Sequence, residues 1–146
     1  MTAARKGITR QEAVRRVLQG MTDDSVGYAA LQTLLEEQFQ ATLQHQSTRL
    51  TALADQVIAA VEPLDARRRQ RVSLVTALLG PQGDMPQLFA LLQEDARSKA
   101  EADWVALEQM VLECKRLNAR NSDLLTEQYS IMQRVLHGEE DTYAPG

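Results

Sequence analysis

The sequence predicts an all-α fold, an elongated antiparallel helical bundle with one long C-terminal helix and a flexible C-terminal tail. Apolar residues recur at three- and four-residue spacing along most of the 146 residues, which is the period of a helix with one buried face. Alternating β-branched runs and Asn-Gly or Asp-Gly hairpin turns are absent. Aromatic residues make up only 4%, and Gly and Pro are few, so aliphatic helical packing is favoured.

The first predicted helix is short and basic. Thr9 and Glu12 fit the pattern of a capping box, and Gly20 is predicted to end this helix. Residues 1–20 carry a net charge of +4 within a chain of net charge −4. We therefore expect a basic N-terminal helical extension over residues 1–21. The charge discontinuity also raises the hypothesis that Met21 is the natural start, which N-terminal sequencing of the native protein would test.

Two further helical segments follow. The first is predicted over residues 24–44, and the polar residues 45–48 either break or bend it. The second continues the helical period to Leu79, with a kink or a new start at Pro63 because proline lacks an amide hydrogen. The sequence Gly80-Pro-Gln-Gly83 predicts a clear stop.

The rest of the chain predicts a short helix, a long helix and a tail. Asp84 or Met85 opens the short helix, with Pro86 in its first turn. The long helix is predicted over residues 97–137, about 60 Å at about 1.5 Å per residue, and Gly138 ends it. These boundaries give a helical domain over 22–138 and a flexible tail over 139–146.

Composition limits the function classes. The net charge of −4 argues against a dedicated nucleic-acid binder. Cys114 is the only cysteine, so no intramolecular disulfide can form, which suits a reducing cytoplasm. No apolar run has the length of a signal peptide or a membrane span. We expect a cytoplasmic protein.

No residue pattern predicts catalysis or a metal site. His45 and His137 lack partners at ligand spacing, and Cys114, within an apolar stripe, is interpreted as a buried structural thiol. The acidic groups Glu36-Glu37 and Glu139 to Asp141 are interpreted as solvated surfaces. No phosphate-binding loop or catalytic motif is found, so we expect no enzyme activity, no cofactor and no metal.

The densest basic cluster is Arg67-Arg-Arg69 with Arg71. It lacks interleaved aromatic residues and lies in an acidic protein, so a solvated helix face, free or paired with the acidic last helix, is favoured over a phosphate-binding surface.

An apolar stripe that carries amides is the strongest functional signal in the chain. Leucines recur at helical spacing near the end of the long helix, but three amide side chains stand among them. A partner-binding groove, a buried specificity device within the bundle and a solvent-facing stripe edge are all compatible with this pattern. The residues are Leu117, Asn118, Asn121, Leu124, Leu125 and Gln128.

This stripe resembles a motif of the FlgN family of flagellar export chaperones. The run from Leu117 to Leu125, followed by Gln128, is similar to the family's Leu-Asn-x-x-Asn-Gly-x-Leu-Leu pattern, with Ser122 in place of the usual Gly. A weaker resemblance lies upstream, in the spacing of Leu43, Leu50 and Leu53. The chain departs from the family pattern there, with Gln46 where Asp is common and Val57 where Lys is common.

The C-terminal tail carries a third, weaker resemblance. Residues 141–146 resemble a short Tyr-Gly-x-x-Gly signature, with Ala144 in place of the first Gly. Together the three motifs extend the resemblance over residues 22–146.

The resemblance implies a cytoplasmic chaperone for the hook-filament junction proteins FlgK and FlgL, whose disordered C-terminal segments it would deliver to the type III export gate. It implies that the six residues of the amide-bearing stripe bind these segments, and that Tyr143 contacts the gate protein FlhA. Membrane insertion and nucleic-acid binding are not expected.

Other functions remain open at the level of sequence. The chain could serve another flagellar or type III substrate, or act as a homodimeric coiled-coil scaffold that uses the same stripe for itself. A helical protein that binds nucleic acid through its basic segments is a further alternative. A monomer or a weak dimer fits the sequence equally.

Overall fold

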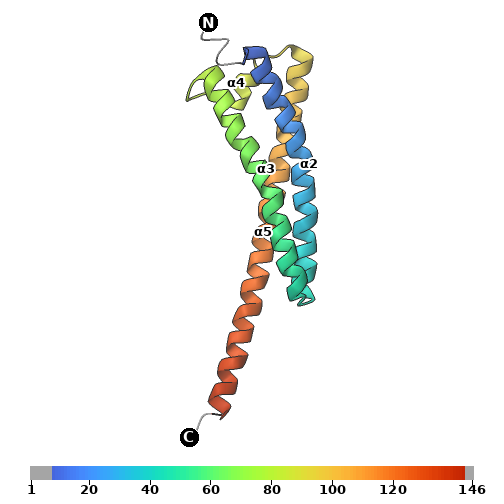
Figure 1. Cartoon of the computed structure of the whole chain (residues 1–146), viewed down its shortest axis with the longest axis vertical. Coiled ribbons are helices and arrows are strands. Elements are labelled where there is room, and N and C mark those ends of the chain that lie inside the picture. Colours follow the sequence, from blue (N-terminus) through green and yellow to red (C-terminus); the bar gives the residue numbers. More distant parts are fainter. Residues whose placement is uncertain (1–7, 144–146) are drawn as a thin grey trace.

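The computed structural model describes residues 8–143, and the side chains of residues 8–138. These residues form four helices and no strand (Figure 1): α2 (Arg10–Leu43), α3 (Ser47–Leu79), α4 (Met85–Phe89) and α5 (Glu94–Tyr143). The prediction of an all-α bundle with one long C-terminal helix is confirmed.

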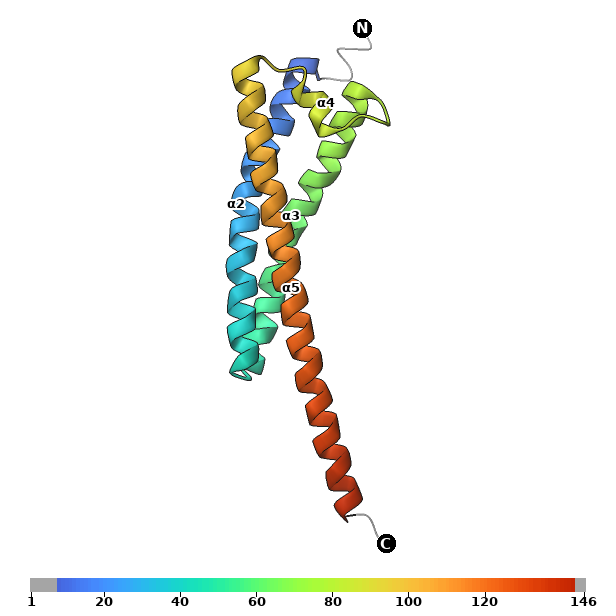
Figure 2. The ribbon, with the colours of Figure 1, turned by 180° about the vertical axis from the view of Figure 1, so that it is seen from behind.

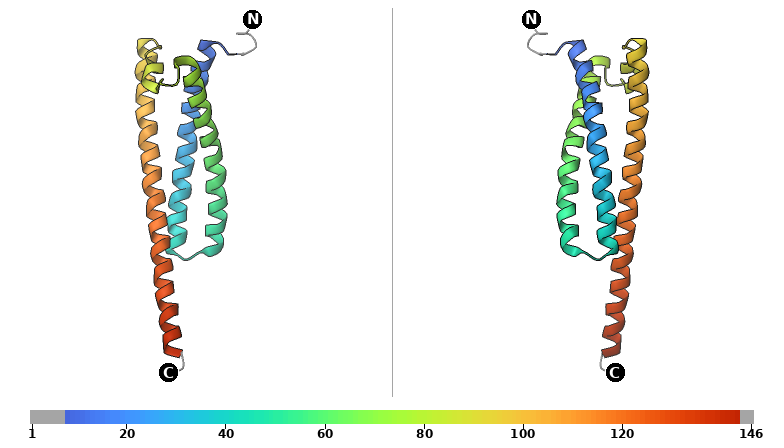
Figure 3. Two further views of the ribbon diagram at one scale, coloured as in Figure 1. Left: turned by 90° about the vertical axis from the view of Figure 1, so that its left-hand side faces the viewer. Right: turned by 90° about the vertical axis from the view of Figure 1, so that its right-hand side faces the viewer.

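Helix α2 is the centre of the bundle. Helix α3 folds back antiparallel to it, whereas α5 runs parallel to α2 and therefore antiparallel to α3 (Figure 2). Both α3 and α5 pack on α2, which lies between them in Figure 3. The C-terminal part of α5 extends beyond the α2–α3 turn and leaves the bundle.

Helix α2 begins where the sequence predicts but does not end at Gly20. The Thr9 hydroxyl accepts a hydrogen bond from the Glu12 amide at 3.0 Å and caps the helix. The prediction of a helix end at Gly20 was wrong, because the buried side chains of Val17, Met21 and Asp24 continue one face across it. Their burial outweighs the roughly 1 kcal/mol by which glycine weakens a helix.

The turn between α2 and α3 falls at residues 44–46. His45 adopts a positive φ of 54°, which breaks the helix rather than bending it. Pro63, by contrast, lies inside α3 and starts no new helix. Leu53 and Leu64 are buried on either side of Pro63. Their packing against α2 compensates for the backbone hydrogen bond that proline cannot make, so the helix continues.

The connection from α3 to α5 uses the stop and start signals of the sequence. Gly80 ends α3 with a φ of 89°, in the region that glycine adopts without strain. Asp84 then forms a capping box with Gln87, in which each side chain bonds the other residue's backbone amide. Both features match the predicted positions.

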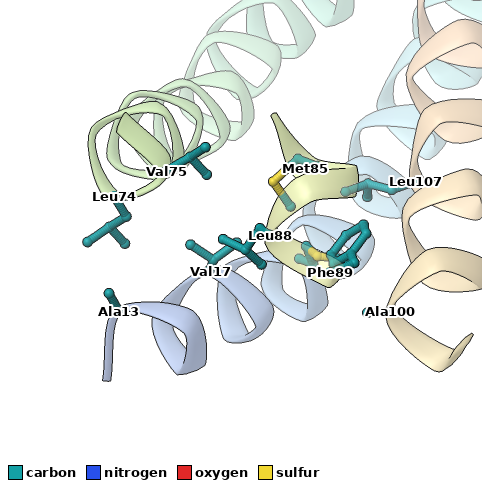
Figure 4. Packing of buried hydrophobic residues seen from close by; sticks show 10 residues of the cluster. Ala13, Val17, Leu74, Val75, Met85, Leu88, Phe89, Ala100 and Leu107 are labelled. Atoms are coloured by element: carbon teal, nitrogen blue, oxygen red, sulfur yellow. The ribbon is translucent and has the colours of Figure 1, made fainter. Parts of the chain in front are cut away.

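Two hydrophobic clusters form the core. In the first, α4 fills the end of the bundle between α3 and α5, with Leu88 and Phe89 fully buried (Figure 4). The second lies further along α2 and consists of Leu31, Leu35, Leu64, Cys114 and Leu117. Together the clusters hold α5 on α2 over only the first part of its length.

The last helix is longer than predicted at both ends. It begins at Glu94 rather than Arg97, and it continues through Gly138 to Tyr143. The prediction of a helix end at Gly138 was therefore wrong. Residues 144–146 of the predicted tail lie outside the described residues, as do the side chains of residues 139–143.

Candidate functional site

Helix α5 carries two parallel stripes of side chains, each with the alternating three- and four-residue spacing of a heptad repeat. The inner stripe faces α2 as far as Gln128 and continues beyond it; it consists of Leu107, Met110, Cys114, Leu117, Asn121, Leu124, Gln128, Ile131 and Val135. The outer stripe is offset by about one residue and consists of Trp104, Glu108, Val111, Lys115, Asn118, Ser122, Leu125, Tyr129, Met132 and Leu136.

The inner stripe is fixed to α2 by a ladder of hydrogen bonds. The Asn121 amide donates to the Leu35 carbonyl at 2.8 Å, and the Gln128 amide donates to the Thr42 carbonyl at 3.0 Å. One heptad earlier the Cys114 thiol lies 3.8 Å from the Tyr28 carbonyl. In all three pairs the donor follows its acceptor by 86 residues, as a parallel pair of helices in one register requires.

Asn121 is the best-satisfied polar residue of the ladder. Its side chain is 1% exposed, and its amide also donates to the Gln38 side chain at 2.9 Å. Its carbonyl accepts two hydrogen bonds from Arg120, which in turn pairs with Glu36 and stacks 3.7 Å above the centre of the Phe39 ring. Both acceptors of the buried Asn121 nitrogen lie on α2, so this side chain specifies the register between α5 and α2.

The six predicted binding residues are divided between the two stripes. Leu117 and Asn121 are buried against α2. Gln128 and Leu124 are half-buried on the same inner stripe. Asn118 and Leu125 are exposed and belong to the outer stripe. The residues therefore do not form one open surface in this structure.

Beyond Gln128, α5 continues as an arm, which we define as residues 129–136. No other described helix packs against it in any view (Figures 1 and 3). Both stripes continue along it, and their apolar side chains are exposed to solvent: Tyr129, Ile131, Met132, Val135 and Leu136. Such a contiguous apolar surface is unusual on a monomeric protein and typical of an interaction site.

A groove runs between α3 and α5, with α2 as its floor. Its lower part has a volume of about 340 Å³ and is lined mostly by apolar side chains: Tyr28, Leu31, Leu35, Val57, Val61, Val111, Cys114, Lys115 and Asn118. A second hollow of about 270 Å³ adjoins it, shares Tyr28 and Val111, and is bordered by Arg71 and Trp104.

A buried ion cluster joins all three long helices and was missed at the level of sequence. Asp24 on α2 is 1% exposed and binds Arg67 at 2.5 Å and Arg71 at 2.8 Å, both on α3. The Arg71 guanidinium also lies 5.3 Å from the centre of the Trp104 ring on α5. No sequence pattern indicated this cluster, because Asp24 resembled an ordinary helix-start residue.

The basic cluster on α3 therefore makes no ion pair with the last helix within the described side chains, and its contact with that helix is the stacking of Arg71 on Trp104. Arg68 and Arg69 pair with Asp65 on their own helix, while Arg67 and Arg71 face α2. Close packing of α2 and α3 helps this arrangement: a Cβ atom on Gly27 would lie 2.8 Å from a Leu64 methyl carbon.

Two titratable groups of the groove, Cys114 and Tyr28, favour their uncharged forms. Burial, with a smaller effect of the Glu113 charge, raises the pKa of the Cys114 thiol. Burial, with the Asp24 charge second, raises the pKa of Tyr28. Neither change activates a nucleophile at neutral pH. Among the residues that the structure describes, no cluster of His, Cys, Asp and Glu could hold a metal ion.

A family model described as FlgN protein matches residues 13–137. The chain belongs to the FlgN family. It is accordingly a flagellar export chaperone, of a family whose members are not enzymes. The match begins inside the predicted N-terminal extension, which agrees with the continuous helix through Gly20. Searches of curated proteins and of solved structures found no match. No described helix is long and apolar enough to cross a membrane.

Proposed function

We propose that this FlgN protein binds the C-terminal segments of the hook-filament junction proteins FlgK and FlgL in the cytoplasm and delivers them to the export gate protein FlhA. The observation that carries the proposal is the arm of α5, whose apolar side chains are exposed and against which no other described helix packs. The arm continues the heptad pattern with which α5 packs on α2, so it is suited to a second helix.

The six residues of the amide-bearing stripe contribute in two ways. Leu124, Leu125 and Gln128 lie where α5 leaves α2, at the start of the cargo surface. Leu117 and Asn121 act from within the bundle, because they hold α5 in the register that makes the arm project. Asn118 is exposed on the outer stripe and free to contact cargo directly.

The chemistry of the arm suits a disordered amphipathic cargo. A segment that folds as a helix on the arm buries its own apolar face and those of the arm residues. Each well-buried aliphatic side chain contributes about 1.5–3 kcal/mol. Ordering the segment opposes this gain, so binding stays moderate and the cargo can be released for export.

Titration calorimetry with synthetic C-terminal segments of FlgK and FlgL tests the proposal. Val135→Lys places a charge on the arm, whereas Val105→Lys is a matched control on the same helix, since the two valines are 57% and 55% exposed. We expect saturable binding by the wild-type protein and by the Val105 variant, and about tenfold or more weaker binding by the Val135 variant. Wild-type protein that is folded but binds neither segment contradicts the proposal.

We further propose that Tyr143 contacts FlhA, with the tyrosine ring and hydroxyl docking together. Its side chain lies outside the described residues, so this proposal is supported by the family resemblance of the C-terminal sequence alone. Tyr143→Ala is expected to abolish capture of the soluble domain of FlhA while cargo binding is unchanged. Equal capture by both proteins contradicts the assignment.

A homodimeric scaffold is the second candidate, because the exposed inner stripe of the arm fits a second copy of itself as well as a cargo helix. Light scattering separates the two functions. A concentration-independent monomer favours the chaperone, whereas a dimer that Val135→Lys dissociates favours the scaffold. A chaperone for a different flagellar or type III substrate would bind that substrate through the same arm.

A further inference from the structure

The outer stripe of α5 links two apolar surfaces that no helix of residues 8–143 covers. In the bundle it supplies one wall of the α3–α5 groove through Val111, Lys115 and Asn118. Further along, it continues on the arm through Tyr129, Met132 and Leu136. The alternation of three- and four-residue steps is unbroken between the two parts, so they lie on one side of one helix.

The groove has three of the four helices of a bundle. Helices α3 and α5 pack on α2 rather than on each other, and their facing walls are aliphatic: Val57 and Val61 on α3, and Val111 on α5. The exposed fraction of Val61 is 41%, although it points into a groove lined by apolar side chains. A fourth amphipathic helix laid on α2 would bury all of these side chains.

We propose that the cargo helix does not end with the arm but continues along the outer stripe into the α3–α5 groove, where it completes a four-helix bundle. This inference rests on the proposed chaperone function and extends its site to α3 and to the floor of the groove on α2. The continuity of the outer stripe favours one long cargo helix over a separate ligand.

The arm alone offers a cargo helix only one wall, whereas the groove offers three. A helix that follows the outer stripe from Trp104 to Leu136 covers about 48 Å at about 1.5 Å per residue, about four times the length of the arm. The added contact is aliphatic and enclosed, so it excludes water better than the open arm does.

Charge on the groove wall specifies one feature of the occupant. Lys115 lines the groove and makes no ion pair with any residue that the structure describes. A cargo helix with a carboxylate beside its apolar face would neutralise this cation. We therefore expect Lys115→Glu to weaken binding, and the effect to shrink as salt is raised.

The experiment compares Val61→Lys with Ile58→Lys. Both residues are exposed β-branched positions on α3, but only Val61 lines the groove. Binding of the FlgK and FlgL C-terminal segments is measured by calorimetry, with circular dichroism to verify that each variant is folded. We expect Val61→Lys to weaken binding about tenfold and Ile58→Lys to change it by less than about twofold. A photo-crosslinker at position 61, but not at 58, is expected to capture the segment.

The possible results separate this inference from the proposed function. If Val135→Lys on the arm weakens binding while Val61→Lys behaves like Ile58→Lys and position 61 captures no cargo, the cargo stays on the arm and the groove inference is wrong. If the wild-type protein binds neither segment, the cargo assignment fails first, and the inference falls with it. If Val61→Lys is unfolded, the crosslinking result alone decides.

Discussion

The two halves of α5 have the same heptad pattern but different surroundings. In the first half the inner stripe is covered by α2, with Leu107 and Leu117 in the core. In the arm the equivalent positions, Ile131 and Val135, are exposed. The change occurs where α2 turns at residues 44–46, not where the sequence of α5 changes character. An apolar stripe therefore reports that a helix needs a partner, but not whether that partner is part of the same chain.

The largest difference between the halves is expected in stability. Leu117→Ala should lower the free energy of unfolding by about 2–5 kcal/mol, because it leaves a cavity beside Leu31 and Leu35. Leu136→Ala on the arm should change it by less than about 0.5 kcal/mol. Chemical denaturation of both variants measures the contrast. Equal losses would mean that the arm is packed in solution.

The ion cluster sharpens the comparison, because it belongs only to the covered half. Asp24→Asn leaves Arg67 and Arg71 without a buried counter-charge. We expect a loss of about 2–3 kcal/mol in unfolding free energy, less than for a fully buried pair since both arginines reach solvent. The exposed neighbour Asp23 provides the control Asp23→Asn, which should be near neutral. If Asp24→Asn leaves the unfolding free energy unchanged, the ion pairs of Asp24 with the two arginines do not stabilise the fold.

The two asparagines of the stripe offer a smaller and more specific test. Asn121→Ala removes the hydrogen bonds to the Leu35 carbonyl and the Gln38 side chain and should lower the unfolding free energy by about 1–3 kcal/mol. Asn118→Ala, on the exposed outer stripe, should leave stability unchanged within about 0.5 kcal/mol. Thermal unfolding of both variants decides. A larger loss of stability in Asn118→Ala than in Asn121→Ala would contradict the assignment of the register contact to Asn121.

The smallest expected effect is a loss of stability at alkaline pH. The folded state raises the pKa of Cys114 and of Tyr28 above their unfolded values. Their contribution to stability is therefore fully present below about pH 8.5 and is lost as pH rises through the folded-state pKa values. Denaturation midpoints measured from pH 8 to pH 10.5 should fall, and less steeply in Cys114→Ala. A midpoint that rises over this range contradicts the assignment.

Local sequence signals correctly predicted the helix ends that are set by a capping residue or by a change in backbone conformation. The capping residues Thr9 and Asp84, and the positive φ of Gly80, act within one turn, so the sequence shows them directly. Gly20, Pro63 and Gly138 were predicted to interrupt helices and do not. At the first two of these positions the helix gains more from side-chain burial on a neighbouring helix than it loses locally, and that gain depends on contacts far along the chain.

The candidate site was only partly predicted, because the burial of its residues also depends on contacts far along the chain. The amides were correctly recognised as unusual in an apolar stripe, and the family assignment is confirmed. Their roles were not separable, because Asn118 and Asn121 differ by less than one helical turn in sequence but face solvent and α2, respectively. The role of the six residues in cargo binding stays a prediction.

The sequence by itself determined the helical class, the main turns and the heptad stripes, because these follow from local conformation and from the spacing of apolar residues. Only the tertiary structure decided that α2 runs parallel to α5, that Asn121 and Gln128 bond its carbonyls, and that α2 ends before α5 does. The physical reason is that burial is a property of pairs of helices: the same stripe is core where a second helix covers it and a binding surface where none does.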